Sequence, residues 1–471
     1  MKAAISLGLI LVTPFSPNLL SENPCLSDNF FGNYKDGGLP YSVLSVANEA
    51  CMDFWEARLD AAHYSPMQGS DRKLVWLEKV AVDEKLQLHT PQEYALEDFL
   101  LSLDTPTGSD HQEVVLSLEG SKASAYDVHY RTGTAALISV DPDLARVIDT
   151  LVPQFWKSAL LPTTPSVFIP VPASAVEPVK QILSNLKFDP VIASVVNNIS
   201  IPQIKNDIRF LTGEDEKSGI ISRHSFATGA QVAAKWLKER VEDTGATCRL
   251  VPFLPGFAPN VICRYSAIEE TNATVLISGH YDSRGSFGSI RAPGGDDDGS
   301  GTTGVLSIAR TIARKGVKFH SNVELAFFAG EEQGLLGSRA YAKELRAAGA
   351  NLTLMIQADM TAYRAPGEPM QLGLPDLIGT PEVTQLVANI SAIYSPELHI
   401  GITPACCSDH QSFHEQGFPA TQVFERAGPI ADPMYHNSGD LSDREGYDFD
   451  QLYAIAKVQF ATILHAAGFE L

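Results

Sequence analysis

Residues 273–283 read ATVLISGHYDS, an almost continuous apolar run that ends in a histidine and an aspartate. Such a run is typical of a strand buried on both faces of a sheet. Similar runs recur at 248–253, 260–266, 322–330, 352–358 and 420–425, and amphipathic helical patterns lie among them at 303–316, 335–349 and 381–393. The alternation predicts an α/β fold whose mainly parallel sheet is covered by helices on both faces.

Two helices are predicted to precede the first strand of this pattern. Ser200 stands before Ile201 and Pro202, a combination typical of a helix start. Thr228 is predicted to cap the second helix and Gly245 to end it. A third cap is predicted at Ser300, where the 303–316 pattern begins.

The 471-residue chain is too long for one average domain, and its two parts differ in their pattern of apolar and proline residues. Residues 196–471 carry the alternating pattern and are interpreted as one domain. Residues 21–195 hold scattered apolar segments and proline clusters, and we interpret them as an N-terminal accessory or pro-region. One lysine followed by an apolar run from Ala3 to Val12 predicts a secretory signal over residues 1–20. No stretch is long and apolar enough to predict membrane insertion.

Several features favour a secreted, extracellular protein, with the vacuole as the alternative compartment. The six cysteines are even in number, and proximity suggests the pairs Cys25–Cys51 and Cys248–Cys263. The adjacent Cys406 and Cys407 either bridge each other or pair elsewhere. Four N-glycan acceptor triplets occur, at Asn198, Asn272, Asn351 and Asn389. The net charge of −21 argues against nucleic acid as a partner, because phosphates would be repelled.

Metal-binding side chains follow several predicted strands. They are His280 in SGHYDS, Asp296 in PGGDDDGSG, Glu332 in FAGEEQG, Asp359 in QADM and His436 in MYHNSGD. Side chains just beyond the carboxyl ends of strands in an open α/β sheet lie close together. Two imidazoles and three carboxylates form the nitrogen- and oxygen-rich set that suits a pair of zinc ions. The set predicts a zinc-dependent hydrolase.

Two further carboxylates are predicted to support this set. Asp282, two residues after His280, can accept a hydrogen bond from the second imidazole nitrogen and so orient the ring. Glu331 stands beside a ligand yet stays free, which is where a general base for water would be placed. Taken singly, each motif has an ordinary alternative: a core histidine, an acidic turn or calcium loop, a surface glutamate pair. Their joint occurrence favours the metal site.

These residues and motifs resemble the two-zinc exopeptidase family that includes secreted leucine aminopeptidases, vacuolar aminopeptidase Y and glutamate carboxypeptidase. The resemblance covers roughly residues 196–471 and implies an α/β/α sandwich of three layers. It implies that Asp296 bridges two zinc ions, with a cis peptide to Asp297. His280 and Asp359 would complete one ion, and Glu332 and His436 the other. It also implies that Glu331 is the base, that Asp282 orients His280, and that the substrates are peptides with large apolar N-terminal residues.

The chain departs from the family pattern near residues 403–410, which read TPACCSDH. Secreted relatives carry a tyrosine shortly before SDH, where this chain has Ala405, and a spaced cysteine pair where this chain has adjacent cysteines. Two alternatives to the aminopeptidase stay open. One is a glutaminyl-peptide cyclase, which has the same fold and one zinc ion. The other is a non-catalytic binding ectodomain, although the complete set of ligands and base argues against it.

Overall fold

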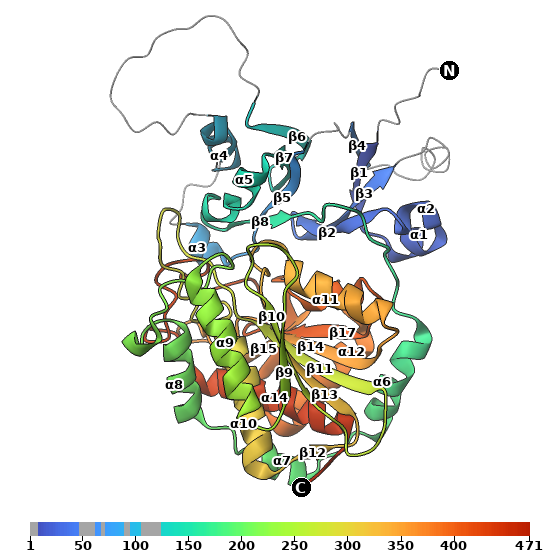
Figure 1. Cartoon of the computed structure of the whole chain (residues 1–471), viewed down its shortest axis with the longest axis vertical. Coiled ribbons are helices and arrows are strands. Elements are labelled where there is room, and N and C mark those ends of the chain that lie inside the picture. Colours follow the sequence, from blue (N-terminus) through green and yellow to red (C-terminus); the bar gives the residue numbers. More distant parts are fainter. Residues whose placement is uncertain (1–7, 47–61, 67–70, 89–94, 105–123) are drawn as a thin grey trace, which may run out of the picture.

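The computed structural model describes residues 8–46, 62–66, 71–88, 95–104 and 124–471 (Figure 1). Its largest sheet has six strands in the order β17-β14-β11-β13-β10-β9. Their bounds are β9 (Thr247–Val251), β10 (Asn260–Tyr265), β11 (Ala273–His280), β13 (Asn322–Phe328), β14 (Asn351–Ala358) and β17 (Ala420–Val423). Every one of these strands coincides with an apolar run that the sequence predicts, because such runs can be buried on both faces.

Strand direction in this sheet is mixed. β17, β14, β11 and β13 pair in parallel, whereas β10 pairs antiparallel with both β13 and β9. The α/β class is therefore confirmed, but two of the five pairings are antiparallel. A short connection explains one of them, since β9 and β10 are consecutive and linked without a crossover helix, and neighbours joined in this way run antiparallel.

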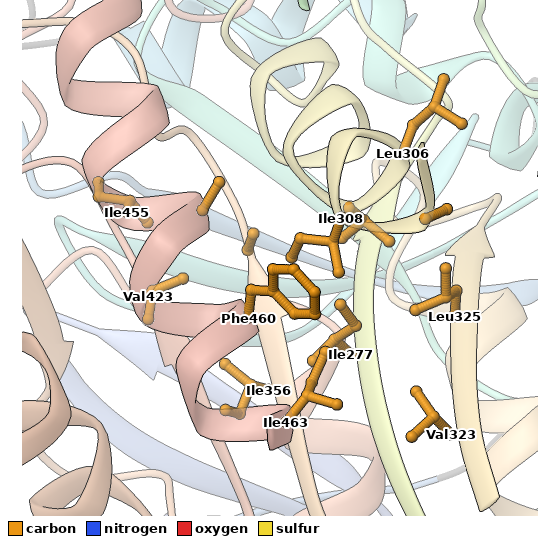
Figure 2. Packing of buried hydrophobic residues seen from close by; sticks show 14 of the residues in the cluster. Ile277, Leu306, Ile308, Val323, Leu325, Ile356, Val423, Ile455, Phe460 and Ile463 are labelled. Carbon is orange, nitrogen blue, oxygen red and sulfur yellow. The ribbon is translucent and has the colours of Figure 1, made fainter. Parts of the chain in front are cut away.

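Helices pack against both faces of this sheet (Figure 1). One face contacts α9 (Thr228–Glu242), α10 (Gly299–Lys315), α12 (Pro381–Tyr394) and α14 (Phe449–Ala467). The other contacts α11 (Leu336–Ala347) and α13 (His410–His414). Alternate strand residues serve the two cores: Ile277 packs with α10 and α14, and Leu276 with α11. Figure 2 shows Phe460 of α14 against Ile308 of α10 and Ile277.

Three helix starts differ in detail from their predictions. α8 (Ile201–Leu211) has Ser200 at its N-cap position, but the Ser200 side chain makes no capping hydrogen bond. α9 begins at Thr228, with Ala227 at the cap position. In α10 the cap is Asp298, whose carboxylate accepts from the amide of Gly301 at 2.8 Å, while Ser300 lies inside the helix. A carboxylate at this position also suits the positive end of the helix dipole.

The N-terminal part contains two antiparallel sheets of four strands (Figure 1). The first has the order β2-β3-β1-β4, with β1 (Leu9–Pro14), β2 (Phe30–Asp36), β3 (Leu39–Val46) and β4 (His63–Pro66). The second has the order β6-β7-β5-β8, with β5 (Lys73–Lys79), β6 (Tyr126–Arg131), β7 (Ala135–Val140) and β8 (Trp156–Leu160). The short helices of this part are α1 (Pro17–Glu22), α2 (Pro24–Ser27), α3 (Glu84–Gln87), α4 (Ala95–Asp104) and α5 (Pro142–Ala145).

The apolar run that predicts a signal falls on β1. Ile10, Leu11 and Val12 are buried there, between β3 and β4. Cleavage at residue 20 would take this strand out of its sheet. The signal over residues 1–20 stays a prediction, and residues 1–7 lie outside the described part.

Two helices before residue 196 pack onto the α/β unit. They are α6 (Ala173–Asn185) and α7 (Pro190–Val196), whose residues Val179, Ile192 and Val195 join the same core as α10 and α14. Judged by these core contacts, the α/β unit begins near residue 173, before the boundary at 195 that the pattern of apolar residues suggests.

The cysteines that the structure describes agree with one predicted pair. Cys248 and Cys263 are bridged between β9 and β10, and Cys406 is bridged to Cys407. The predicted partner of Cys25, Cys51, lies outside the described residues. Among the helices of the described part, none combines the length and apolar character needed to cross a membrane.

Candidate active site

Three adjacent parallel strands bring the predicted ligands to one edge of the sheet. His280 is the last residue of β11, Asp359 directly follows β14, and Glu331 and Glu332 lie three and four residues beyond β13. Because β11 lies between β13 and β14, these side chains converge, as the sequence predicts. His436 approaches from the loop between β17 and α14 and has a left-handed φ of 53°.

The ligating atoms form two groups that share one carboxylate. His280, Asp297 and Asp359 form the first, and Asp297, Glu332 and His436 the second, with the potential ligand atoms of each group within 4.8 Å of one another. One oxygen of Asp297 lies 3.2 Å from Nε2 of His280, and the other lies 3.2 Å from Nε2 of His436. Burial raises the pKa of Asp297, but the two imidazoles outweigh burial and hold its pKa below the usual 3.8.

The shared carboxylate is Asp297, one residue after the predicted Asp296. The side chain of Asp296 turns away from both histidines and accepts a hydrogen bond from the amide of Ala362 at 2.8 Å. Burial raises the pKa of Asp296 to about 6. The cis peptide bond also shifts by one residue, joining Asp297 to Asp298. The assignment of Asp296 as a ligand is therefore corrected to Asp297.

Asp440 explains how this loop is held. Its carboxylate accepts hydrogen bonds from the amides of both Asp296 and Asp297, at 3.0–3.1 Å. Arg444 donates to Asp440 at 2.9 Å and keeps that carboxylate in place. These hydrogen bonds to Asp440 fix the backbone of the loop, so the direction of each aspartate side chain follows from its position along the loop.

Asp282 connects the histidine loop with the glutamate loop. Its carboxylate accepts from Ser225 Oγ at 2.9 Å and lies 3.4 Å from the amides of Glu331 and Glu332. Nδ1 of His280 lies 3.2 Å from the backbone oxygen of Asp282 and 3.5 Å from its carboxylate. Asp282 thus lies where the sequence predicts, but its backbone carbonyl makes the shorter contact with the ring.

Glu331 lies beside the ligands without belonging to either group. Its carboxylate is 3.9 Å from Nε2 of His280. Burial raises the pKa of Glu331 well above 4.5, and the neighbouring carboxylates of Asp359 and Glu332 add to the rise. A buried carboxylate with a raised pKa, facing a set of ligands, has the properties of a general base.

The residues of both groups fit divalent zinc. Nε2 of His280 and Oε1 of Glu332 are buried and have no hydrogen-bond partner, which is costly for polar atoms unless a cation takes them as ligands. Each group offers one imidazole nitrogen and carboxylate oxygens, which are donors that zinc accepts. The shared position of Asp297 suits two ions that have a common ligand.

A cavity of about 90 Å³ opens over these ligands, and both parts of the chain line it. Its polar lining includes Asp297, Glu331, Glu332, Asp359 and His436. Its apolar lining includes Leu335, Met360, Ile378, Phe424 and Ile430, and Ala405, Cys406 and Cys407 also line it. Asn33, Lys35, Glu78 and Lys157 enter from the N-terminal sheets.

Sequence reasoning missed this contribution of the N-terminal part. It also missed Arg284, whose Nη1 lies 2.8 Å from Nδ1 of His436 and donates to the backbone oxygen of Trp156 at 3.1 Å. No spacing pattern marks Arg284 or Lys157, since their neighbours come from distant parts of the chain. The one signal that could have pointed to Arg284 is its position, two residues after Asp282 in the His280–Asp282 motif.

Comparisons with known proteins show which family the chain resembles. The sequence pattern of Peptidase family M28 matches residues 260–462. A probable leucine aminopeptidase of Arthroderma otae is 30% identical over 283 residues, which covers 57% of this chain and 73% of that protein. Leucine aminopeptidase 1 of Sclerotinia sclerotiorum is 34% identical over 194 residues, covering 38% and 49%.

Solved structures extend the likeness to the N-terminal part. The LapA aminopeptidase of Legionella pneumophila superposes with a TM-score of 0.60 at 16% identity, covering 85% of this chain and 99% of that one. At this identity the match shows a shared fold. Because the match covers 85% of this chain, it extends beyond the α/β unit into the N-terminal part.

Proposed function

Since the chain belongs to peptidase family M28, we propose that it is a secreted aminopeptidase that uses two zinc ions to remove large apolar residues from peptide N-termini. One observation carries this proposal: the Asp297 carboxylate lies between His280 and His436, at 3.2 Å from each, with an uncommitted glutamate beside it. The leucine aminopeptidases among the relatives support the choice of reaction.

We assign one ion to His280, Asp359 and Asp297, and the other to Glu332, His436 and Asp297. When bound, zinc polarises a substrate carbonyl and lowers the pKa of water. Asp282 would keep His280 in place, and the cavity walls would exclude bulk water around the scissile bond.

Glu331 is the proposed base. It takes the proton of the attacking water as that oxygen adds to the peptide carbonyl carbon. When the C–N bond breaks, Glu331 returns the proton to the leaving amine. Its raised pKa suits both steps, because a carboxyl group with a pKa nearer neutrality both takes and releases a proton readily.

The apolar wall formed by Met360, Phe424 and Ile430 supports the preference for a large apolar residue. The disulfide between Cys248 and Cys263 supports export to an oxidising compartment. Asn198, Asn272 and Asn351 are exposed, as glycan attachment requires, and Asn389 is partly exposed. Glycosylation at these four positions is part of the proposal.

Metal analysis combined with substrate profiling tests the proposal. Purified protein should contain two zinc ions per chain and release p-nitroaniline fastest from leucine or a similarly large apolar residue. A single zinc ion with cyclisation of N-terminal glutamine would instead identify a cyclase. Release of residues from peptide C-termini, or no turnover with zinc bound, would contradict the assignment as an aminopeptidase. N-terminal sequencing of the secreted protein would locate any cleavage.

A further inference from the structure

Strand β8 lies against the candidate active site and is anchored there at both ends. At one end, the amide of Leu160 donates to the backbone oxygen of Gln333, the residue after Glu332, at 2.8 Å. At the other, the backbone oxygen of Trp156 accepts from Arg284, whose same nitrogen contacts His436. Each end of β8 is thus bonded to a residue next to, or in contact with, a proposed zinc ligand.

Glycine at position 334 permits this close approach. Gly334 has a φ of 117°, and a Cβ added to it would lie 2.9 Å from the Leu160 amide nitrogen and 3.2 Å from Cα of Ala159. The loop that carries Glu331 and Glu332 therefore touches the backbone of β8. A segment held at this distance has a defined position relative to the ligands.

Lys157 is the cationic side chain that β8 brings to the cavity. Lys157 lines the same cavity as Asp297, Glu331 and Asp359. Its Nζ lies 3.3 Å from Oε1 of Glu78, its cross-strand neighbour on β5. Burial lowers the pKa of Lys157, but attraction to Glu78 and then Glu331 outweighs burial, so its pKa lies above the usual 10.5. The side chain therefore carries a positive charge near the base.

Two other cations at the cavity are held by the protein itself. Lys35 donates from Nζ to the backbone oxygen of Pro404 at 2.7 Å. Arg339 donates to the backbone oxygen of Phe31 and to the hydroxyl of Tyr34. Lys157 differs in the charges around it. Its ion pair with Glu78 uses one of three N–H donors, and its next attraction is to Glu331 of the site. The charges that act on Lys35 are Asp376, Glu78 and Lys157, and burial lowers the pKa of Lys35.

We propose that Lys157 stabilises the oxyanion that forms when water adds to the scissile carbonyl, so that the N-terminal part completes the active site. In this step the oxygen of water bonds to the carbonyl carbon, the carbonyl π electrons move to its oxygen, and Glu331 takes the proton. Lys157 keeps its own protons and donates a hydrogen bond to the new oxyanion. When the C–N bond breaks, the electrons return and the proton on Glu331 passes to the amine. The proposal rests on the proposed peptidase function.

Substitution of Lys157 by methionine tests this role, because methionine keeps much of the length and removes the charge. We expect kcat on leucine p-nitroanilide to fall by roughly 10²- to 10³-fold, as when an oxyanion donor is lost, with little change in KM. Inhibition by the phosphonic acid analogue of leucine, which carries an anionic tetrahedral centre, should weaken in parallel. Inhibition by leucinol, which lacks that charge, should change less than threefold. Lys157→Arg should recover part of kcat.

The matched control is Lys79→Met on β5, which removes the same charge from a residue outside the cavity and should leave kcat unchanged. A second control separates catalysis from neutralisation of Glu78. If Lys157 serves only to pair with Glu78, the double variant Glu78→Gln with Lys157→Met should recover activity. If Lys157 acts on the oxyanion, the double variant should stay slow. The double variant also serves if Lys157→Met alone misfolds, because it does not leave the Glu78 carboxylate buried without its ion-pair partner.

Wild-type kcat in Lys157→Met, equal weakening of phosphonate and leucinol, or recovery in the double variant would each overturn the role of Lys157. Zinc content and melting temperature, measured for every variant, identify any loss that comes from misfolding. Failure of the proposed function looks different: the wild-type protein itself would then release no N-terminal residue.

Discussion

Asp296, Asp297 and Asp298 are chemically identical, yet the loop gives them three surroundings. Asp296 faces the amide of Ala362, Asp297 faces the two histidines, and Asp298 caps α10. The sequence predicts that this acidic run belongs to the site, because other metal-binding side chains follow the predicted strands on either side of it in the sequence. It could not predict which aspartate faces the metals, since that depends on backbone direction and on Asp440, which comes 143 residues after Asp297.

The corrected assignment predicts opposite results for two neighbouring substitutions. Asp297→Asn should lose zinc and activity together, because it removes a ligand shared by both groups. Asp296→Asn should keep two zinc ions, although its hydrogen bond with the amide of Ala362 would be disturbed. Zinc content by atomic emission, with circular dichroism to confirm folding, distinguishes them. Equal zinc loss in both variants would show that Asp296 is also a metal ligand.

Glu331→Gln should retain zinc and lose turnover. The substitution removes the proton acceptor but no ligand, so we expect kcat to fall by roughly 10²- to 10⁴-fold, as is common when a general acid–base group is lost. Single-turnover kinetics with leucine p-nitroanilide and zinc analysis of the same sample check this. The neighbouring substitution Glu332→Gln, which changes a ligand, should lower zinc occupancy. Zinc loss in Glu331→Gln would show that the two roles are exchanged.

At the scale of elements, the strands and helices of the α/β unit follow from hydrophobic periodicity. The apolar runs at β11, β13 and β14 each end at a site residue, as predicted. The N-terminal sheets are harder to predict, because β8 is a five-residue strand, WKSAL, that proline-containing segments flank. Its place against the glutamate loop depends on contacts with Gln333 and Arg284, which local patterns do not encode.

Gly334 offers a test of how tightly β8 docks. Gly334→Ala should lower the melting temperature and kcat, because the new methyl group would meet the backbone of Leu160 and Ala159. Gly349→Ala is the control, since Gly349 also has a positive φ, of 63°, but has open space around it. The control should cost only about 1 kcal/mol of stability and leave kcat unchanged. Equal effects in both variants would show that backbone strain, and not docking, is responsible.

At the scale of the whole molecule, a partly buried ion pair joins the N-terminal part to the α/β unit. Oδ2 of Asp149 lies 2.7 Å from Nε2 of His224 and also accepts from Gln333. Burial lowers the pKa of His224, but Asp149 outweighs burial and the pKa lies above 6.5. Burial raises the pKa of Asp149, but His224 outweighs it and the pKa lies below 3.8. The fold therefore favours the charged form of both groups.

This pair predicts a pH dependence of stability. A raised histidine pKa contributes stability below pH 6.5, which is lost as the pH rises through the folded-state value. A lowered aspartate pKa contributes stability above pH 3.8, which is lost as the pH falls through the folded-state value. The difference in melting temperature between wild type and His224→Gln should therefore be largest between these limits and shrink as the pH rises through the folded-state pKa of His224. A constant difference across pH would contradict a charged pair.

Contacts between distant residues also set the order in which the protein can become active. Asn33 donates to Glu415, 382 positions further along the chain, and His436 comes after every strand of the six-stranded sheet. A chain emerging from the ribosome makes its N-terminal sheets first, long before the ligands they will cover exist. Hydrolytic competence would then arrive only after His436 has been synthesised and has folded against the earlier ligands.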